Sequence, residues 1–462
     1  MGDIDVALCV NLHTMSEEFA CFVDGLRFSD IPEEVIARAK LHLMDTIGVS
    51  AAGSLEPGSR SISEALKKAA GSGESTVMWH GFRASAPIAA LANGSMAHAL
   101  DYDDTHLGSI MHLSSPLVST VLSLGEAIHA SGAEVMTALV AGYEVNSRIG
   151  MASRGKFHEK GFHATSVCGV LGCSLAAGKL LDHSKAQLSG AMGIAGSMSS
   201  GLMEFLSDGS WVKPLHVGWA AHAGIMAALL AGQGLSGPAR ILEGDRGVYA
   251  AYAGFRPSFE EVVAGLGREW ETMNISFKLF PNCHLIHEFM HAALAIKKKH
   301  RISHRDIREA TCFVSELAIP IICLPADRKL NPKTRYDAMF SLPYGVATVL
   351  VKGSANIRDF DVEGGVDRDV ALLSRKIGFQ RADSPDKELI EIVMVDGSRY
   401  TVKKSDIASP ALIDIMAKFR SNARLVVTDE VAEELIDIIM NVDRLDDVGE
   451  LVKHCVAGGA AP

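Results

Sequence analysis

The stretch GFHATSVCGVLGCSLAAGKLL, residues 161–181, predicts a helix buried among closely packed helices. Gly, Ala, Ser and Cys recur along it, and no Asp, Glu, Arg or Lys precedes Lys179. Small side chains shorten the distance at which two helices pack. His163 stands directly before the expected helix start at Ala164, where free backbone amides attract carboxylates. An imidazole there can meet a bound organic acid or simply cap the turn, and the segment alone leaves both interpretations open.

The composition extends this prediction to most of the chain. Its 462 residues suggest two domains. Hydrophobic residues make up 48%, aromatic residues only 6%, and glycine contributes 43 residues, which favours helices in close contact. Pro32 followed by two glutamates opens the first clear helix. Further helices are expected over residues 86–101, 115–130, 133–152, 164–181, 184–203 and 217–232.

The pattern changes after about residue 255. Thr311–Ile322 and Leu389–Val402 look like strands, and Asp396-Gly397 between two alternating runs predicts a hairpin. Helices are expected over residues 284–300, 338–352, 366–379 and 409–455. The predicted fold is therefore mainly α, with a helical domain (1–265 and 405–462) interrupted by a smaller α+β domain (266–404). A site is expected in the cleft between the two domains.

Charge and cysteine usage exclude several function classes. Lys and Arg number 44 against 55 Asp and Glu, a formal charge of −11, which disfavours a nucleic-acid partner. Eight cysteines form no CxxC pair, so we expect reduced thiols in the cytoplasm rather than a Cys-rich metal module. The N-terminus lacks the features of a signal peptide. Val217–Leu235 comes nearest to a membrane span, but its His, Gln and glycines favour a buried helix, so no membrane partner is expected.

The densest titratable chemistry lies in AHALDYDDTHLGSIMH, residues 97–112. Three aspartates and three histidines fall within sixteen otherwise small or apolar residues. They can bind a metal, carry out general acid–base catalysis, or cap turns and stay satisfied in the core. The stretch alone leaves these three interpretations open.

Two later segments add cations and imidazoles. In LSDGSWVKPLHVGWAAHAG, residues 206–224, Lys213 precedes a proline, so its backbone is expected to be extended in a loop; the plain alternative is a solvated lysine. In NISFKLFPNCHLIHEFMH, residues 274–291, Lys278 is followed by HEFMH, which satisfies the zinc motif HExxH. The glycine and third histidine of the extended motif are missing, which disfavours a zinc hydrolase.

Five segments together resemble the MmgE/PrpD family, in family order and over about residues 15–455: NGSMAHALDYDDTH, GFHATSVCGVLGCSLAAGKLL, DGSWVKPLHVGWAAHAG, KLFPNCHLIH and FSLPYGVATVL. The family includes 2-methylcitrate dehydratase, cis-aconitate decarboxylase and iminodisuccinate epimerase. The resemblance implies a large helical domain formed by both chain ends, an α+β lid domain, a homodimer, and catalysis of a small carboxylate without cofactor or metal.

The same resemblance implies which residues surround the cleft. Lys213 and Lys278 would hold carboxylates and stabilise developing charge. His163 would move a proton at carbon, and His112 would assist or protonate a leaving hydroxyl. The remaining implied site residues are Asp101, which would orient or charge a histidine, Tyr344, which would bring a hydroxyl from the lid domain, and Thr105, Cys283 and His287, which would contact the substrate.

Two departures bear on the substrate. The decarboxylases of the family carry a histidine where Cys283 aligns, and the usual HPS is replaced by His112-Leu113-Ser114. From the resemblance we expect a hydro-lyase similar to 2-methylcitrate dehydratase that acts on a di- or tricarboxylate. The alternatives are an epimerase of a small dicarboxylate, a decarboxylase of the cis-aconitate type, a non-catalytic binding protein and, from another class, the zinc hydrolase.

Overall fold

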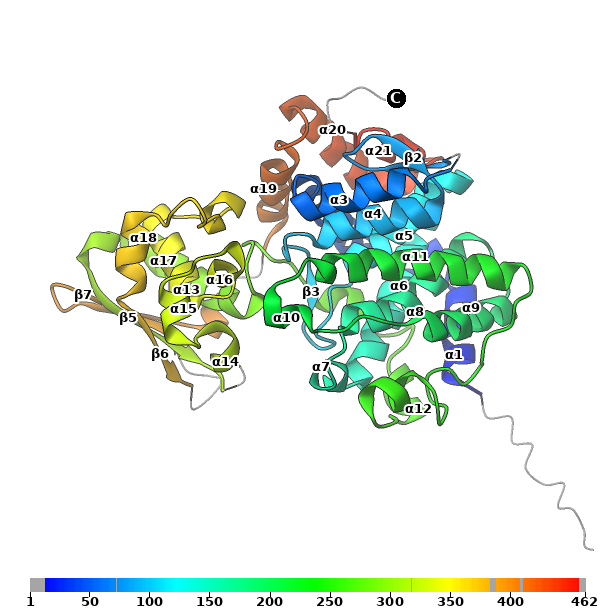
Figure 1. The fold of residues 1–462 in the computed structure, drawn as a ribbon, viewed down its shortest axis with the longest axis horizontal. Helices are drawn as coiled ribbons and strands as arrows, with labels where there is room; N and C mark the ends of the chain where they lie inside the picture. The colour runs from blue at the N-terminus through cyan, green and yellow to red at the C-terminus, as the bar shows by residue number, and fades with distance from the viewer. Residues whose placement is uncertain (1–12, 72, 317, 383–387, 408–409, 457–462) are drawn as a thin grey trace, which may run out of the picture. The chain divides into compact units, whose positions relative to one another are not determined.

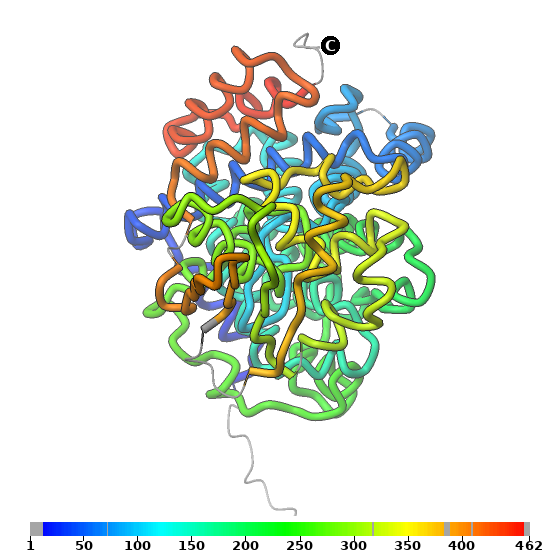
Figure 2. Tube along the Cα trace, turned by 90° about the vertical axis from the view of Figure 1, so that its left-hand side faces the viewer, coloured from blue at the N-terminus to red at the C-terminus, as the bar shows by residue number. Residues whose placement is uncertain are grey.

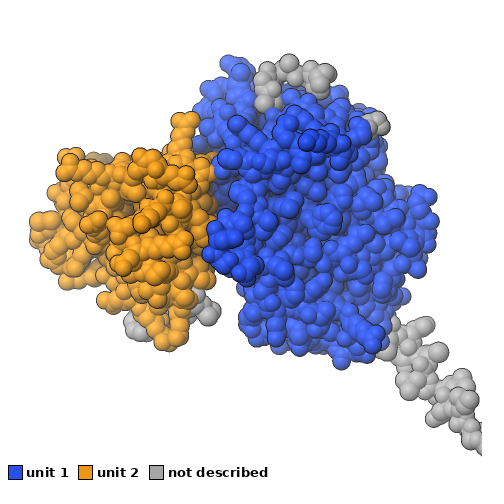
Figure 3. All heavy atoms as spheres, viewed as in Figure 1, with its two compact units in different colours: residues 1–277, 415–462 blue, residues 278–414 orange. Residues whose placement is uncertain are grey.

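A computed structural model describes residues 13–71, 73–316, 318–382, 388–407 and 410–456 of the chain. The chain forms two compact units, coloured separately in Figure 3. Unit 1 comprises residues 1–277 and 415–462, and unit 2 comprises residues 278–414. The predicted domain boundaries lie at 265/266 and 404/405, whereas the two units of the structure divide at 277/278 and 414/415.

Unit 1 is a bundle of helices to which both ends of the chain contribute (Figure 1). The C-terminal α20 packs against α2, and α21 packs against α5; Figure 2 shows these segments together at one end of the unit. The helices are α1 (Met15–Gly25), α2 (Glu33–Gly53), α3 (Pro57–Lys67), α4 (Ala86–His98), α5 (Ser114–Ile128), α6 (Gly132–Ala152), α7 (Lys156–Glu159), α8 (Ala164–Leu180), α9 (Lys185–Met198), α10 (Phe205–Asp208), α11 (Val212–Gly232), α12 (Phe259–Val263), α19 (Leu412–Ala423), α20 (Asp429–Met440) and α21 (Gly449–Val452). The boundary at 414/415 falls within the first turn of α19, so most of that helix belongs to unit 1.

The helix predicted from residues 161–181 is α8, and it lies in the core of unit 1. It packs against α5, α6, α9 and α11, and every residue from Ala164 to Gly178 is buried. Close packing depends on its small residues: a methyl group added at Gly224 of α11 would overlap Cys173 of α8, and one added at Gly172 would overlap Asn146 of α6. The expectation of closely approaching helices is confirmed.

Two short antiparallel pairs complete unit 1. They are β1 (Ser75–Val77) with β2 (Phe82–Ala84), and β3 (Thr105–His106) with β4 (Ile275–Ser276). Among the helices that the structure describes, α11 is the one long and apolar enough to cross a membrane, and 56% of its most apolar window is buried inside the structure. That burial is what a core helix of a bundle shows.

Unit 2 is the smaller α+β part. Its sheet has the order β6-β5-β7-β8, with β6 parallel to β5 and the other pairs antiparallel. The strands are β5 (Ile307–Val314), β6 (Ile377–Arg381), β7 (Glu388–Met394) and β8 (Arg399–Lys403). The helices are α13 (His284–His300), α14 (Ile319–Ile322), α15 (Ala326–Leu330), α16 (Arg335–Met339), α17 (Leu342–Lys352) and α18 (Arg368–Ser374), and α13 packs on β7, β8 and α17.

The predicted hairpin is confirmed: Gly397, with φ of +89°, turns the chain between β7 and β8. Two other predictions for unit 2 are wrong. The strand expected up to Ile322 ends at Val314, because Pro320 lacks the N–H that a strand ladder needs and instead starts α14. The helix expected to continue to residue 379 ends at Ser374, because the chain then pairs with β5 as β6.

Candidate active site

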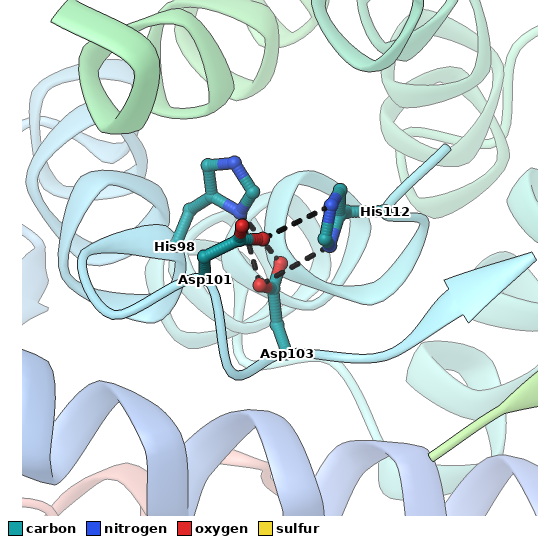
Figure 4. A group of neighbouring side chains, drawn as sticks. All are labelled: His98, Asp101, Asp103 and His112. Carbon is teal, nitrogen blue, oxygen red and sulfur yellow. Dashed lines mark hydrogen bonds and ion pairs between the residues drawn. The ribbon is translucent and has the colours of Figure 1, made fainter. Parts of the chain in front are cut away.

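Four titratable side chains meet at the end of α4 and in the loop that follows it (Figure 4). One nitrogen or oxygen atom from each of the four side chains can be chosen so that these four atoms all lie within 4.8 Å of one another. His98 Nδ1 lies 2.9 Å from Asp103 Oδ2. His112 has a carboxylate at each nitrogen: Nε2 lies 3.3 Å from Asp101 Oδ1, and Nδ1 lies 3.2 Å from Asp103 Oδ1. The four residues His98, Asp101, Asp103 and His112 are called the loop cluster below.

Local structure explains why the loop cluster forms. Asp101 has φ of +48°, a left-handed conformation that Asp tolerates better than most residues. This lets the chain reverse directly after α4. The serines that start α5 then hold the loop, since Ser115 Oγ donates to Asp103 at 2.6 Å and the Ser114 N–H donates to Asp104 at 3.2 Å. Asp104 is also paired with His42 at 2.7 Å.

Lys213 joins the loop cluster from another part of the chain. Its Nζ lies 3.1 Å from Asp101 Oδ2, and its side chain is only 22% exposed, so it is not a freely solvated lysine. Its predicted extended loop is wrong. Lys213 is the second residue of α11, because Pro214 is tolerated in the first turn of a helix, where no N–H bond is lost.

His163 is the N-cap residue of α8, as expected, but its side chain makes no capping hydrogen bond. The ring is 3% exposed and lies 5.8 Å from the ring of His98 and 5.5 Å from that of His216, between centroids. Its Nδ1 has no hydrogen-bond partner among the described residues. Burial and the neighbouring charge of Lys213 hold the pKa of His163 well below 6.5, so its imidazole is neutral.

The electrostatics of the loop cluster separate its charges. Burial alone would raise the pKa of Asp103, but the charges and hydrogen bonds of His112 and His98 outweigh it and hold that pKa well below its usual range. Burial lowers the pKa of His98 to about 4. Burial, with the charges of Lys213 and His112, likewise lowers the pKa of His158 to about 4. Asp103, whose carboxylate stays ionised, thus lies beside His98, whose imidazole resists protonation.

The other predicted site residues lie in two places. Thr105 belongs to unit 1, where it is buried in β3 with no hydrogen-bond partner for its Oγ1 in the described part of the chain. The remaining four belong to unit 2 and are buried: Lys278, Cys283 at the N-cap of α13, His287, whose Nε2 lies 3.3 Å from the Asn282 carbonyl, and Tyr344, whose hydroxyl donates to the Asp359 carbonyl at 2.7 Å.

Four residues of the candidate site were not among the predicted site residues: His98, Asp103, His158 and His216. The first two lie inside the stretch 97–112, and alternating histidines and carboxylates at that density could have singled them out. His216 follows Lys213 by three residues, which is one helical turn. No sequence signal points to His158, which is identified only by its electrostatic coupling to Lys213 and His112.

Two groups of residues raise the question of a metal. Two imidazoles and two carboxylates are a suitable donor set for a divalent cation. In the loop cluster, however, these atoms already pair with one another, and the Lys213 ammonium contacts Asp101, so a cation would have to displace those pairs. In HEFMH, Glu288 is paired with Lys404 at 2.9 Å, which occupies the carboxylate that a zinc hydrolase would use as its base.

Comparisons with known proteins cover both units. The family profiles of the MmgE/PrpD N-terminal and C-terminal domains match residues 17–260 and 280–444. The chain is 28% identical to cis-aconitate decarboxylase of Homo sapiens, with 95% of this chain and 94% of that protein aligned. It is 27% identical to cis-aconitate decarboxylase of Aspergillus terreus, with 95% of each chain aligned. It is also 27% identical to cis-aconitate decarboxylase of Mus musculus, with 96% and 93% aligned.

Proposed function

The chain belongs to the MmgE/PrpD family and is a lyase that acts on a tricarboxylate, and we propose that its reaction is the decarboxylation of cis-aconitate or of a closely similar acid. The alignment with cis-aconitate decarboxylases over nearly the whole chain supports this choice. The observation that supports this chemistry is the position of His112 between the carboxylates of Asp101 and Asp103. Asp101 in turn contacts the ammonium group of Lys213.

Binding starts from charge. The protein is negative overall, so a substrate with three carboxylates needs local cations. Lys213 provides one, and its contact with Asp101 is an ion pair that a substrate carboxylate can share or replace. Asp101 also contacts His112. A substrate carboxylate that binds Lys213 therefore changes the surroundings of the imidazole that takes part in the next step.

The chemical step requires a proton donor. Decarboxylation breaks one carbon–carboxylate bond, and the electron pair left behind spreads through the adjacent double bond toward another carboxylate as carbon dioxide leaves. A proton must then be added at carbon. His112 has a carboxylate oxygen near each ring nitrogen, 3.3 Å from Nε2 and 3.2 Å from Nδ1. We assign His112 as the group that supplies this proton.

His163 fits a different task. Its buried, neutral imidazole with an open Nδ1 can bind a polar group of the substrate without adding charge to the site. The same property favours a second candidate reaction. In a dehydration, neutral His163 would remove a proton from carbon while His112 protonates the departing hydroxyl, as expected for a 2-methylcitrate dehydratase. The two reactions therefore use one constellation with different assignments.

Proton NMR in heavy water distinguishes these reactions. We expect cis-aconitate to be converted to a five-carbon unsaturated dicarboxylate that carries one deuteron at carbon, with one carbon dioxide released per turnover. An enzyme that leaves cis-aconitate intact but forms an alkene from 2-methylcitrate is the dehydratase. Deuterium washed into recovered starting material without an alkene indicates an epimerase, and no turnover of any of these acids contradicts the lyase.

The roles of the unit 2 residues and the oligomeric state of the protein are predictions. Lys278, Cys283, His287 and Tyr344 are expected to contact the substrate because they match the family motifs. The homodimeric state, the cytoplasmic location and catalysis without a cofactor belong to the same proposal. Tyr344 needs a change of partner for its role, because its hydroxyl proton is given to the Asp359 carbonyl and burial raises its pKa to about 12.

A further inference from the structure

A buried ion pair joins α19 to α2 and is not part of the loop cluster. Lys418 of α19 and Asp45 of α2 are 3% and 1% exposed, and Lys418 Nζ lies 2.7 Å from Asp45 Oδ1. Burying two charges is costly, and a buried ion pair is weak evidence for stability by itself. Its presence in the core of unit 1 therefore calls for another role.

The same ammonium group also holds the active-site loop. Lys418 Nζ donates to the backbone carbonyl of Tyr102 at 2.8 Å and lies 3.9 Å from the centroid of the Tyr102 ring. Tyr102 separates Asp101 from Asp103, the two carboxylates that face His112. A shift of the Tyr102 carbonyl would move both carboxylates, because they are its direct neighbours in the chain.

The positive charge of Lys418 stabilises the loop in addition to its hydrogen bond to Tyr102. Three buried carboxylates, those of Asp45, Asp103 and Asp104, all interact favourably with it. Burial raises the pKa of Asp45 to about 6 even beside Lys418, which shows how poorly the surroundings tolerate unbalanced negative charge. The buried positive charge of Lys418 therefore balances carboxylates on both α2 and the loop.

From these contacts we infer that Lys418, held by Asp45, is a positioning residue of the active site that fixes the peptide between Asp101 and Asp103. The inference rests on the proposed lyase function. It gives the C-terminal segment of unit 1 a part in catalysis, although no hydrogen bond or ion pair in the described part of the chain joins Lys418 to His112, His163 or Lys213.

The test compares variants that remove different parts of this arrangement. Lys418→Met removes the donor to Tyr102. Asp45→Asn keeps an oxygen that can accept from Lys418. The double variant Asp45→Asn/Lys418→Met removes both charges, so no buried charge is left unpaired. The matched control is Lys40→Met: Lys40 of α2 also ties α2 to the C-terminal segment, pairing with Asp443 at 2.5 Å and donating to the Met440 carbonyl, but it does not contact the loop.

We expect the double variant to recover much of the urea stability that is lost in Lys418→Met. Its kcat for the tricarboxylate should stay about 10- to 100-fold below that of wild type, because the catalytic groups on the loop are misplaced. KM should change less than kcat. Lys40→Met should keep kcat within about threefold of wild type per folded molecule, since it leaves the donor to Tyr102 and its partner Asp45 in place. Asp45→Asn should lower kcat less than Lys418→Met does, because the donor to Tyr102 remains.

A wild-type kcat in the folded double variant would overturn the inference. If the double variant fails to fold, the single variants decide: an equal loss of kcat per folded molecule in Lys418→Met and Asp45→Asn would overturn it. A second readout does not need turnover. The ring-proton NMR signals of His98 and His112 should move in Lys418→Met and stay in place in Lys40→Met. If the wild-type protein turns over no tricarboxylate, the lyase proposal fails, and these signals still decide the role of Lys418.

Discussion

His112 and His163 show how surroundings give one residue type two chemical roles. His112 has a carboxylate at each nitrogen, whereas His163 has burial, imidazoles and an ammonium group around it. Burial and the charge of Lys213 oppose a bound proton on the His163 ring and lower its pKa. The sequence identified both histidines as site residues, but it could not assign this difference, because the contacts come from segments far apart in the chain.

The buried histidines also make stability depend on pH. Burial, with Lys213 and His112, lowers the folded-state pKa of His158 to about 4, while an unfolded histidine titrates near 6.5. The unfolded state therefore binds the proton first. The stabilising contribution is complete above pH 6.5 and is lost as the pH falls through about 4.

We predict that wild type loses more urea stability between pH 7 and pH 5 than His158→Gln does, by about 2 kcal/mol for one such histidine. The measurement is the urea unfolding curve of both proteins at the two pH values. Equal losses in wild type and His158→Gln would show that His158 titrates in the folded protein as it does in the unfolded chain.

Among the elements, the helix pair α8 and α11 determines where His163 and Lys213 stand, since these residues lie at or next to the N-termini of the two helices. The helices approach closely because Gly224 faces Cys173. Periodicity and small residues were sufficient to predict both helices. The start of α11 was misplaced by five residues (217 instead of 212), because Pro214 was read as excluding helix rather than opening it.

Gly224→Ala tests this packing. The added methyl group meets Cys173 and the backbone of Ser174, and we expect the overpacking to cost about 1–3 kcal/mol, more than the helix propensity of Ala returns. Gly25→Ala is the control, because Gly25 also lies in a helix, α1, and has no atom within 4 Å of an added Cβ. Urea midpoints check both; an unchanged midpoint for Gly224→Ala would contradict close packing of α8 and α11.

For the molecule as a whole, sequence patterns predicted the fold class and most helices of unit 1, because a buried apolar face repeats at the helical period. They failed at α14 and β6 of unit 2, where a proline and the pairing with β5 override local preference. Four of the predicted site residues, Asp101, His112, His163 and Lys213, gather in unit 1. Lys418 could not have been anticipated, since its role depends on contact between residues 316 positions apart.

His112, held between Asp101 and Asp103, is proposed to supply the proton in a tricarboxylate lyase reaction. The direct measurement is the kcat of His112→Gln with cis-aconitate, compared with wild type and with His129→Gln, a change at a histidine that is 79% exposed. We predict a loss of about 100-fold or more for His112→Gln and none for His129→Gln. Full activity in a folded His112→Gln protein would show that His112 does not supply the proton.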